Sequence, residues 1–413
     1  MVCLPIVFGG QTFAHDDHHL SADGPYIIYH PDGSVRVVSV SVEGNITDTV
    51  LPSRHSPLVS QPFTVTSHNG KHRFSVSLHH FERPQWKSPQ PPKLFVTSDP
   101  HGDLDCLVSL LQGNGIIDSN YRWTYSNNRL VVIGDVFDRG KDVIQILWLL
   151  YKLEHEAALS GGSVDFLLGN HEPMVLMNDL RYTKEKYKLL AERLCMEYPQ
   201  LLSRSTELGY WLSTRNTMQV IGNNLFVHAG ISGQLLEQNL SVPTVNEQMS
   251  HGLYLNKSQR RAESPLTHFL FASKGPVWYR GMVLDQPKYA PIAKDTLEMV
   301  LRQYNVDRVV VGHTIFDDIS SFHSGRVIAV NVDNKKNREN HKSRAILIED
   351  DRIYIIYDDP ARKHLLHNRE TDISFKYVKF HYAEADCALG CCHAVELSSL
   401  ATGKFGSVAL FCL

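Results

Sequence analysis

Five apolar runs in this chain each end in polar residues of the kind that bind metal ions. The clearest is "VVIGDVFDRG" at 131–140, where strand-forming residues pass directly into two carboxylates and an arginine. The polar residues that close the five runs are Asp99 and His101, Asp135, Asn170 and His171, His228, and His313. This repeated ending constrains the fold strongly, because it places charge at the points where buried strands stop.

These residues lie far apart in the sequence, but a sheet can bring them together. Side chains at the carboxyl ends of strands converge on one edge of an α/β sheet, where ligands commonly bind. Asp, Asn and His together form a ligand set for divalent transition metals, and a carboxylate can bridge two ions. Glycines beside these residues would let the backbone turn sharply as each strand ends. We therefore expect metal ions to neutralise the charge at this edge.

The pattern of strands and helices predicts one large α/β domain with smaller additions. A chain of 413 residues is long enough for such a domain. Beyond residue 93, apolar strands alternate with helical segments, of which 141–159 is the clearest. Segments 179–215 and 240–273 read as helices or loops over one end of the sheet, and 343–358 reads as a closing hairpin.

The part of the chain before this core predicts a β-rich N-terminal region at 15–92. Apolar and polar side chains alternate there between turn residues, which is typical of antiparallel strands. The proline-rich segment 83–93 favours a short extended linker. We expect the α/β core to occupy 93–359 and a C-terminal tail of unknown role to occupy 360–413.

Charge and hydropathy exclude two classes of partner. The formal net charge of −3 provides no basic field for nucleic acid. The sequence contains no apolar run of about 18 residues or more, which is the length needed to span a bilayer. Residues 1–14 resemble a signal peptide, although they lack the basic residues that normally precede the apolar part. A functional leader would make the protein periplasmic or secreted, and otherwise we expect it in the cytoplasm.

The ordered strand ends resemble the motifs of a known family, the calcineurin-like metallophosphoesterases, and within it the phosphoprotein phosphatases. "DPHGD", "GDVFDRG", "GNHE", "HAG" and "GHT" follow one another between residue 93 and about residue 335, in the order in which that family has them. "GDVFDRGKDV", "LLGNHEPM" followed by "NDLRY", and "VWYRG" are similar to the bacterial-type branch called Shewanella-like protein phosphatases. The resemblance implies a core of β-sheets, a β-sandwich, flanked by helices.

Carried over residue by residue, the resemblance implies two divalent metal ions. Asp99 and His101 would bind the first ion, and Asp135 would bridge both. The second ion would be bound by Asn170, His228 and His313. Such mixed ligands accept manganese, iron or zinc, so the metals are not determined by the sequence. Ser98, where the family usually has glycine, and Pro100 could shift the first loop.

The resemblance also implies the catalytic groups. A hydroxide that bridges the two ions would attack phosphorus directly, with His171 as the general acid and Asp138 orienting it. Arg139 and Arg280 would grip the phosphate oxygens, which favours a dianionic monoester. Tyr279 and the helical segments around 179–215 would form the rim of an open groove.

Each of these motifs has an ordinary explanation when taken alone. "GD" is a common turn, the histidines could be core residues, and Arg280 could lie on the surface. Five motifs in order favour a phosphatase that acts on phosphorylated protein or peptide, at serine, threonine or tyrosine. The alternatives are a nucleotide hydrolase similar to the dinucleoside tetraphosphatases, which would need a closed pocket with an aromatic clamp, and a non-catalytic binding module. The complete ligand set argues against the binding module.

Overall fold

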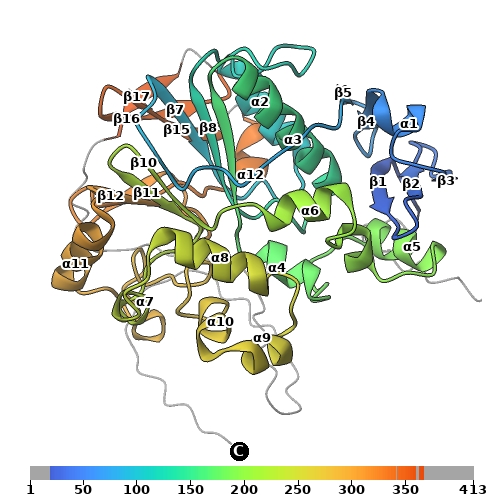
Figure 1. The fold of residues 1–413 in the computed structure, drawn as a ribbon. Coiled ribbons are helices and arrows are strands. Elements are labelled where there is room, and N and C mark those ends of the chain that lie inside the picture. Colours follow the sequence, from blue (N-terminus) through green and yellow to red (C-terminus); the bar gives the residue numbers. More distant parts are fainter. Residues whose placement is uncertain (1–18, 341, 360–361, 367–413) are drawn as a thin grey trace, which may run out of the picture. The chain divides into compact units, whose positions relative to one another are not determined.

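Two six-stranded sheets provide the centre of the fold in the computed structural model, which describes residues 19–340, 342–359 and 362–366 (Figure 1). The strand order in the first sheet is β17-β16-β15-β7-β8-β9, with β7, β8 and β9 parallel. Its strands are β7 (Lys93–Thr97), β8 (Arg129–Ile133), β9 (Ser163–Leu167), β15 (Arg344–Glu349), β16 (Arg352–Tyr357) and β17 (Lys363–Leu365).

The second sheet has the order β13-β14-β12-β11-β10-β6, with β11, β12 and β14 parallel. Its strands are β6 (Lys87–Ser88), β10 (Met218–Ile221), β11 (Asn224–Val227), β12 (Arg308–Val311), β13 (Ser320–Phe322) and β14 (Val327–Ala329). Because β11 and β12 run parallel, their carboxyl ends lie at the same edge of this sheet.

Alternate residues of each strand fill the space between the two sheets. Leu94 and Val96 of β7 lie in one buried cluster with Phe226 of β11 and Val310 of β12. The intervening residue Phe95 points the other way, into the cluster formed with the helices. Both faces of the central strands are buried, so their sequences are almost continuously apolar.

Helices cover the outer face of each sheet. The first sheet packs against α2 (Leu104–Gly113) and α3 (Val143–Leu159). The second sheet packs against α7 (Gly233–Glu237), α8 (Val242–Gly252), α10 (Pro265–Leu270) and α11 (Lys294–Tyr304). The predicted α/β class, a β-sandwich flanked by helices, is confirmed.

The two segments predicted as helices or loops contain short helices. Segment 179–215 contains α5 (Glu185–Arg193), the 3-10 helix η1 (Tyr198–Leu202) and α6 (Glu207–Ser213). Segment 240–273 contains α8, α10 and, between them, α9 (Lys257–Glu263). The remaining short helices are α1 (Pro57–Ser60), α4 (His171–Leu176), η2 (Pro287–Tyr289) and α12 (Asn334–Arg338). Within the described residues, no helix is long and apolar enough to cross a membrane.

The predicted β-rich N-terminal addition is also present. It consists of an antiparallel sheet of β1 (Asp23–Tyr29), β2 (Val35–Val40) and β3 (Ile46–Leu51), and a hairpin of β4 (Phe63–Thr66) and β5 (Arg73–Val76). Trp148 of α3 donates a hydrogen bond from Nε1 to the carbonyl of Pro25 at 3.0 Å, and its ring packs edge-on to Phe63. These strands therefore pack in the same hydrophobic core as α3.

The proline-rich segment 83–93 is extended, as expected, but part of it pairs with the second sheet. The amides of Val220 and Gly222 donate to the carbonyls of Trp86 and Ser88 at 2.8 and 2.9 Å. At the other end of the core, β17 adds an edge strand to the first sheet beyond residue 359. The limits 15–92, 93–359 and 360–413 stay predictions, and residues 1–14 and most of 360–413 lie outside the described residues.

The closing hairpin forms at the predicted place. β15 pairs with β16 from Arg344↔Tyr357 to Glu349↔Arg352. Asp350 and Asp351 connect them with φ angles of 50° and 59°. Positive φ at both central residues is the signature of a type I′ turn, whose twist matches that of the paired strands.

Replacing Phe226 by alanine tests the packing between the sheets. Phe226 is completely buried, so its loss should lower the free energy of unfolding by about 3–5 kcal/mol. Urea unfolding would measure the change. Met299→Ala on the exposed side of α11 is the control and should change stability by less than about 0.5 kcal/mol. Equal losses in the two variants would contradict the proposed core.

Candidate metal centre and active site

Strands from both sheets end at a common edge, where the predicted residues come together. Asp99, Asp135 and Asn170 follow β7, β8 and β9, while His228 and His313 follow β11 and β12. Backbone hydrogen bonds join neighbouring loops there, from Asp99 N to Gly134 O at 3.1 Å and from Gly312 N to His228 O at 2.9 Å. The sandwich thus brings residues from distant parts of the sequence into one site.

Several of the predicted site residues adopt left-handed backbone conformations themselves. We expected adjacent glycines to make the sharp turns, and Gly134 does so with a φ of 74°. Positive φ is also found at Asp99 (51°), His101 (42°), Asp135 (55°), Asp138 (69°), Arg139 (63°) and His313 (62°). Asp and His tolerate this conformation better than most residues, but it still requires support from surrounding contacts.

Two glycines are required by the close approach of the loops. A Cβ atom on Gly134 would lie 2.6 Å from Nδ1 of His228, and a Cβ on Gly169 would lie 2.2 Å from Oδ1 of Asp135. Both distances are shorter than van der Waals contact. Glycine at these two positions therefore lets the histidine and the carboxylate approach the backbone of neighbouring loops.

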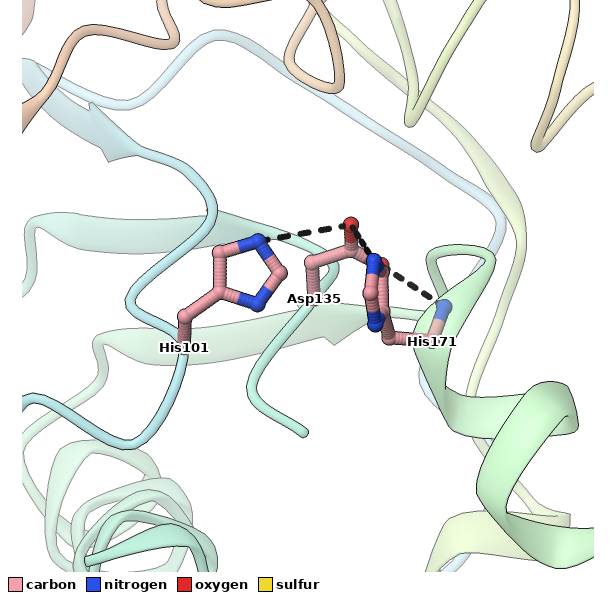
Figure 2. A group of neighbouring side chains, drawn as sticks. All are labelled: His101, Asp135 and His171. Carbon is pink, nitrogen blue, oxygen red and sulfur yellow. Dashed lines mark hydrogen bonds and ion pairs between the residues drawn. The ribbon is translucent and has the colours of Figure 1, made fainter. Parts of the chain in front are cut away.

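The carboxylate of Asp135 lies between two groups of possible metal ligands. One group contains Asp135, His101 and His171, and the other contains Asp135, His228 and His313. Within each group the ligand atoms lie within 4.8 Å of one another. Figure 2 shows the first group, in which the Nε2 atoms of His101 and His171 lie 3.8 and 3.9 Å from Oδ2 of Asp135. Asp135 belongs to both groups, which is the arrangement that a bridging ligand needs.

The other predicted ligands border this centre. Nε2 of His228 lies 3.2 Å from Oδ2 of Asp135 and 3.1 Å from Oδ1 of Asn170. The amide of His313 donates to Oδ2 of Asp99 at 3.0 Å, which ties the end of β12 to the end of β7. All six predicted ligands are therefore brought together, whereas their assignment to individual ions stays a prediction.

The orientation of the imidazoles suits metal binding. Nδ1 of His101 lies 2.8 Å from the carbonyl of Phe137, and Nδ1 of His228 lies 2.9 Å from the carbonyl of Ile133. A carbonyl accepts a hydrogen bond, so it fixes the proton on Nδ1 and leaves the Nε2 lone pair directed into the site. Nε2 of His313 is buried and has no hydrogen-bond partner in the described residues. A divalent ion would satisfy these nitrogen atoms.

Burial and charge determine the protonation of the site. Burial lowers the pKa of His101 to about 3, which keeps this imidazole neutral, as a ligand must be. Burial raises the pKa of Asp99 to about 6. For His228, burial opposes the charged form, but the carboxylates of Asp135 and Asp99 outweigh it and raise the pKa to about 9. The two acidic groups therefore attract positive charge: without an ion His228 holds the extra proton, and a divalent ion bound at Nε2 would displace it.

His171 and Asp138 form a close polar pair in the site. Nδ1 of His171 lies 2.6 Å from Oδ2 of Asp138, and both residues are almost completely buried. Burial alone would lower the pKa of His171, but the carboxylates of Asp135 and Asp138 raise it above its ordinary value. Asp138 therefore holds the ring with Nε2 toward Asp135 and favours the protonated imidazole.

The two predicted phosphate-binding arginines border the same centre. Nη2 of Arg139 lies 3.5 Å from Nε2 of His171. Nη1 of Arg280 donates to the hydroxyl of Thr314 at 2.9 Å and to the carbonyl of His313 at 3.3 Å. Arg280 is thus close to a predicted ligand and not a remote surface residue.

The prediction for Tyr279 is wrong. Its side chain is buried in the core beside the second sheet, and its hydroxyl donates to the carbonyl of Ala290 at 2.7 Å. The neighbouring Trp278 instead reaches the site, with its ring centroid 5.8 Å from that of His313. In the segment around 179–215, Tyr182 is 38% exposed, and its ring lies 5.5 Å from that of His171.

Glu172 was not singled out in the sequence, although it closes the "GNHE" motif. This buried carboxylate accepts hydrogen bonds from Gly169 N at 2.6 Å, Val136 N at 2.8 Å and Asp135 N at 3.2 Å. Burial and the charge of Asp135 raise the pKa of Glu172 to about 7. The residue joins the two loops that carry Asp135 and Asn170, and its place in the motif was the available signal.

Comparison with known proteins agrees with this geometry. A model of the calcineurin-like phosphoesterase family matches residues 92–316. The chain belongs to this family. It is 27% identical over 276 residues to Shewanella-like protein phosphatase 2 of Arabidopsis thaliana, a match that covers 56% of this chain and 68% of that protein. The cold-active protein-tyrosine phosphatase of a psychrophilic Shewanella species has a TM-score of 0.74 and 29% identity, and the match covers 84% of this chain and 99% of that structure.

A shorter match concerns a nucleotide hydrolase. The asymmetrical bis(5'-nucleosyl)-tetraphosphatase of Oceanobacillus iheyensis is 36% identical over 80 residues, which cover 19% of this chain and 30% of that protein. The predicted resemblance to the calcineurin-like family and its Shewanella-like phosphatases is confirmed. This calcineurin-like phosphoesterase is therefore a member of a phosphatase family that uses divalent metals and acts on phosphorylated substrates.

Replacing Asp135 by asparagine tests the metal centre. We expect two divalent ions per chain in the wild-type phosphoesterase and a loss of both together in Asp135→Asn, because one carboxylate serves both ligand groups. Elemental analysis at saturating metal would measure the stoichiometry. Asp318→Asn, whose side chain is 51% exposed, should retain both ions. Loss of a single ion from Asp135→Asn would contradict the bridging role.

Proposed function

We propose that the protein hydrolyses phosphate monoesters on phosphorylated proteins or peptides in one step, without a phosphoenzyme. One observation carries this proposal: the His171–Asp138 pair directs Nε2 of His171 to within 3.9 Å of Asp135, the carboxylate shared by both ligand groups. A proton donor thus lies beside the centre where water would be activated. Hydrolysis of a phosphate monoester with a poor leaving group, such as a serine or threonine alkoxide, uses both functions.

Two divalent ions, when bound, would lower the pKa of a water molecule and polarise the phosphate. Asp99 and His101 would hold the first ion, and Asp135 would serve both. The second ion would be held by Asn170, His228 and His313. Carbonyl contacts fix the imidazoles of His101 and His228 for this purpose.

His171 would protonate the leaving oxygen. An alkoxide or phenoxide leaves more easily as the neutral alcohol, so a positioned acid lowers the barrier. Asp138 accepts a hydrogen bond from Nδ1 of His171, so that Nε2 is the ring nitrogen that faces the centre. The raised pKa of His171, caused by Asp135 and Asp138 against the effect of burial, favours the protonated form that an acid requires.

Arg139 and Arg280 would bind the phosphate oxygens from two sides. Arg139 follows Asp138 directly and lies beside His171, while Arg280 lies beside His313 on a different loop. A guanidinium donates two parallel hydrogen bonds, and such bonds to an anion are stronger than neutral ones. Two such groups favour a dianionic monoester over a diester, which carries a second substituent.

The comparisons support a protein substrate more than a nucleotide. The Arabidopsis and Shewanella proteins described above are both named as protein phosphatases, and the Shewanella protein is named as a tyrosine phosphatase. The nucleotide hydrolase matches over less than a fifth of this chain. Because of this similarity, dinucleotide hydrolysis is the alternative function.

Replacing His171 by asparagine tests the acid. Turnover should fall by roughly 10²- to 10⁴-fold for phosphopeptides, the usual effect of losing a positioned proton donor. The loss should be smaller for p-nitrophenyl phosphate, whose leaving group needs little protonation, and metal content should stay unchanged. Steady-state kinetics and elemental analysis would measure these effects.

His251→Asn is the control for this variant, because His251 is exposed and pairs with Glu263 at the surface. Its kinetics should match those of the wild type. An equal loss for good and poor leaving groups would refute the acid role of His171. Loss of a metal ion from His171→Asn would instead indicate that His171 is a metal ligand.

Replacing Arg280 by alanine tests whether this residue binds the substrate phosphate and which class of substrate the protein prefers. KM for phosphopeptides should rise and kcat should fall, because the same contact would stabilise the bound phosphate and the charge of the transition state. Arg302→Ala, on the exposed face of α11, should leave both constants unchanged. A kcat/KM for diadenosine tetraphosphate well above that for every phosphopeptide tested would establish the alternative function.

A further inference from the structure

The loop that carries Asp138 and Arg139 is fixed by two residues outside the predicted catalytic set. The hydroxyl of Thr183 donates to Oδ1 of Asp138 at 2.7 Å, and the amide of Arg139 donates to the carbonyl of Tyr182 at 2.9 Å. Asp138 and Arg139 are both in the left-handed region, with φ angles of 69° and 63°. Such a turn is unfavourable for these residue types unless neighbouring contacts hold it.

The Thr183 hydroxyl completes the hydrogen bonding of the Asp138 carboxylate. Oδ2 of Asp138 is used by Nδ1 of His171, and Oδ1 is used by Thr183. Asp138 is 2% exposed and Thr183 is 7% exposed, so water has little access to replace the hydroxyl. Two hydrogen bonds on opposite oxygens fix the plane of the carboxylate, and this plane determines the direction of the His171 ring.

Thr183 comes just before α5, and α5 is anchored on the N-terminal strands. Nζ of Lys186 donates to the carbonyl of Ala22 at 3.0 Å and lies 3.5 Å from Oδ1 of Asp23, at the start of β1. The side chains of this ion pair are 4% and 2% exposed. A buried ion pair of this kind is sensitive to the loss of one partner, because the other charge is left uncompensated.

Two further contacts attach the end of the same loop. The hydroxyl of Tyr187, on α5, accepts a hydrogen bond from the amide of Val143 at 2.9 Å. The amide of His68, in the turn between β4 and β5, donates to Oδ1 of Asp142 at 2.6 Å, and its Nδ1 lies 2.7 Å from Oδ2. The loop from 138 to 143 is therefore held at its start by Tyr182 and Thr183 and at its end by both α5 and the N-terminal hairpin.

We propose that Thr183 is a positioning residue for the His171–Asp138 pair, and that the N-terminal strands brace it through Lys186. The β-rich addition is then part of the machinery that orients the proton donor. This inference rests on the proposed function, in which His171 protonates the leaving group. The path runs from Asp23 through Lys186 and α5 to Thr183, and then through Asp138 to His171.

Replacing Thr183 by valine removes the hydroxyl and keeps the shape. We expect kcat for a phosphoserine peptide to fall roughly 10-fold or more, as when a hydrogen bond to a carboxylate is lost. The loss for p-nitrophenyl phosphate should be smaller, and KM and metal content should stay unchanged. Thr183→Ser restores the donor and should recover most of the turnover. A general loss of structure would not produce this dependence on the leaving group or this rescue.

Replacing Lys186 by methionine tests the brace, with Lys188→Met on the same helix as the matched control. The side chain of Lys188 is 39% exposed and forms a surface pair with Glu185. Lys186→Met should reproduce the leaving-group-dependent loss of Thr183→Val, and Lys188→Met should behave as the wild type. If Lys186→Met does not fold, the double variant D23N/K186M, which leaves no buried unpaired charge, takes its place.

The outcomes separate this inference from the proposed function. If His171→Asn itself shows no dependence on the leaving group, the proposed function fails. If His171→Asn shows the dependence but Thr183→Val does not, the positioning role of Thr183 fails alone. If Thr183→Val shows it but neither Lys186→Met nor the double variant does, the brace by the N-terminal strands is refuted.

Discussion

The rest of the site depends on the interaction between the buried carboxylate of Asp135 and the histidines around it. This carboxylate faces the Nε2 atoms of His228, His101 and His171 at 3.2, 3.8 and 3.9 Å, and it belongs to both groups of possible ligands. Burial alone would raise the pKa of this carboxyl, but the surrounding histidines hold it well below its ordinary value. A buried anion at this position needs positive charge around it, and two metal ions would provide it.

The sandwich supports this anion by fixing loops that would not be stable alone. Both sheets deliver their strand ends to one edge, and Glu172 ties the loop of Asp135 to the loop of Asn170. Left-handed residues such as Asp99 and His313 need such support, because their conformation is unfavourable in isolation. In our proposal, α5 and the N-terminal strands extend the same support to the His171–Asp138 pair.

The sequence predicted the parts of this structure that local pattern determines. Apolar strands, the helix at 141–159 and the hairpin turn at Asp350 have short-range signals, and the order of the motifs indicated the edge where the ligands meet. The position of Tyr279 was predicted wrongly because a tyrosine next to a site residue can lie either at the rim of a groove or in the hydrophobic core. The role of Thr183 and the pairing of β6 depend on contacts between distant segments, which no local pattern contains. The roles of the ligands themselves stay predictions.

Anomalous X-ray scattering from crystals grown with manganese would show whether two ions share the carboxylate of Asp135. We expect two strong peaks about 3.5 to 4 Å apart, the usual spacing of a two-metal site, with a carboxylate oxygen of Asp135 between them. His101 should lie against one peak, and His228 and His313 against the other. A single peak, or two peaks that do not share Asp135, would show that this carboxylate does not bridge two ions.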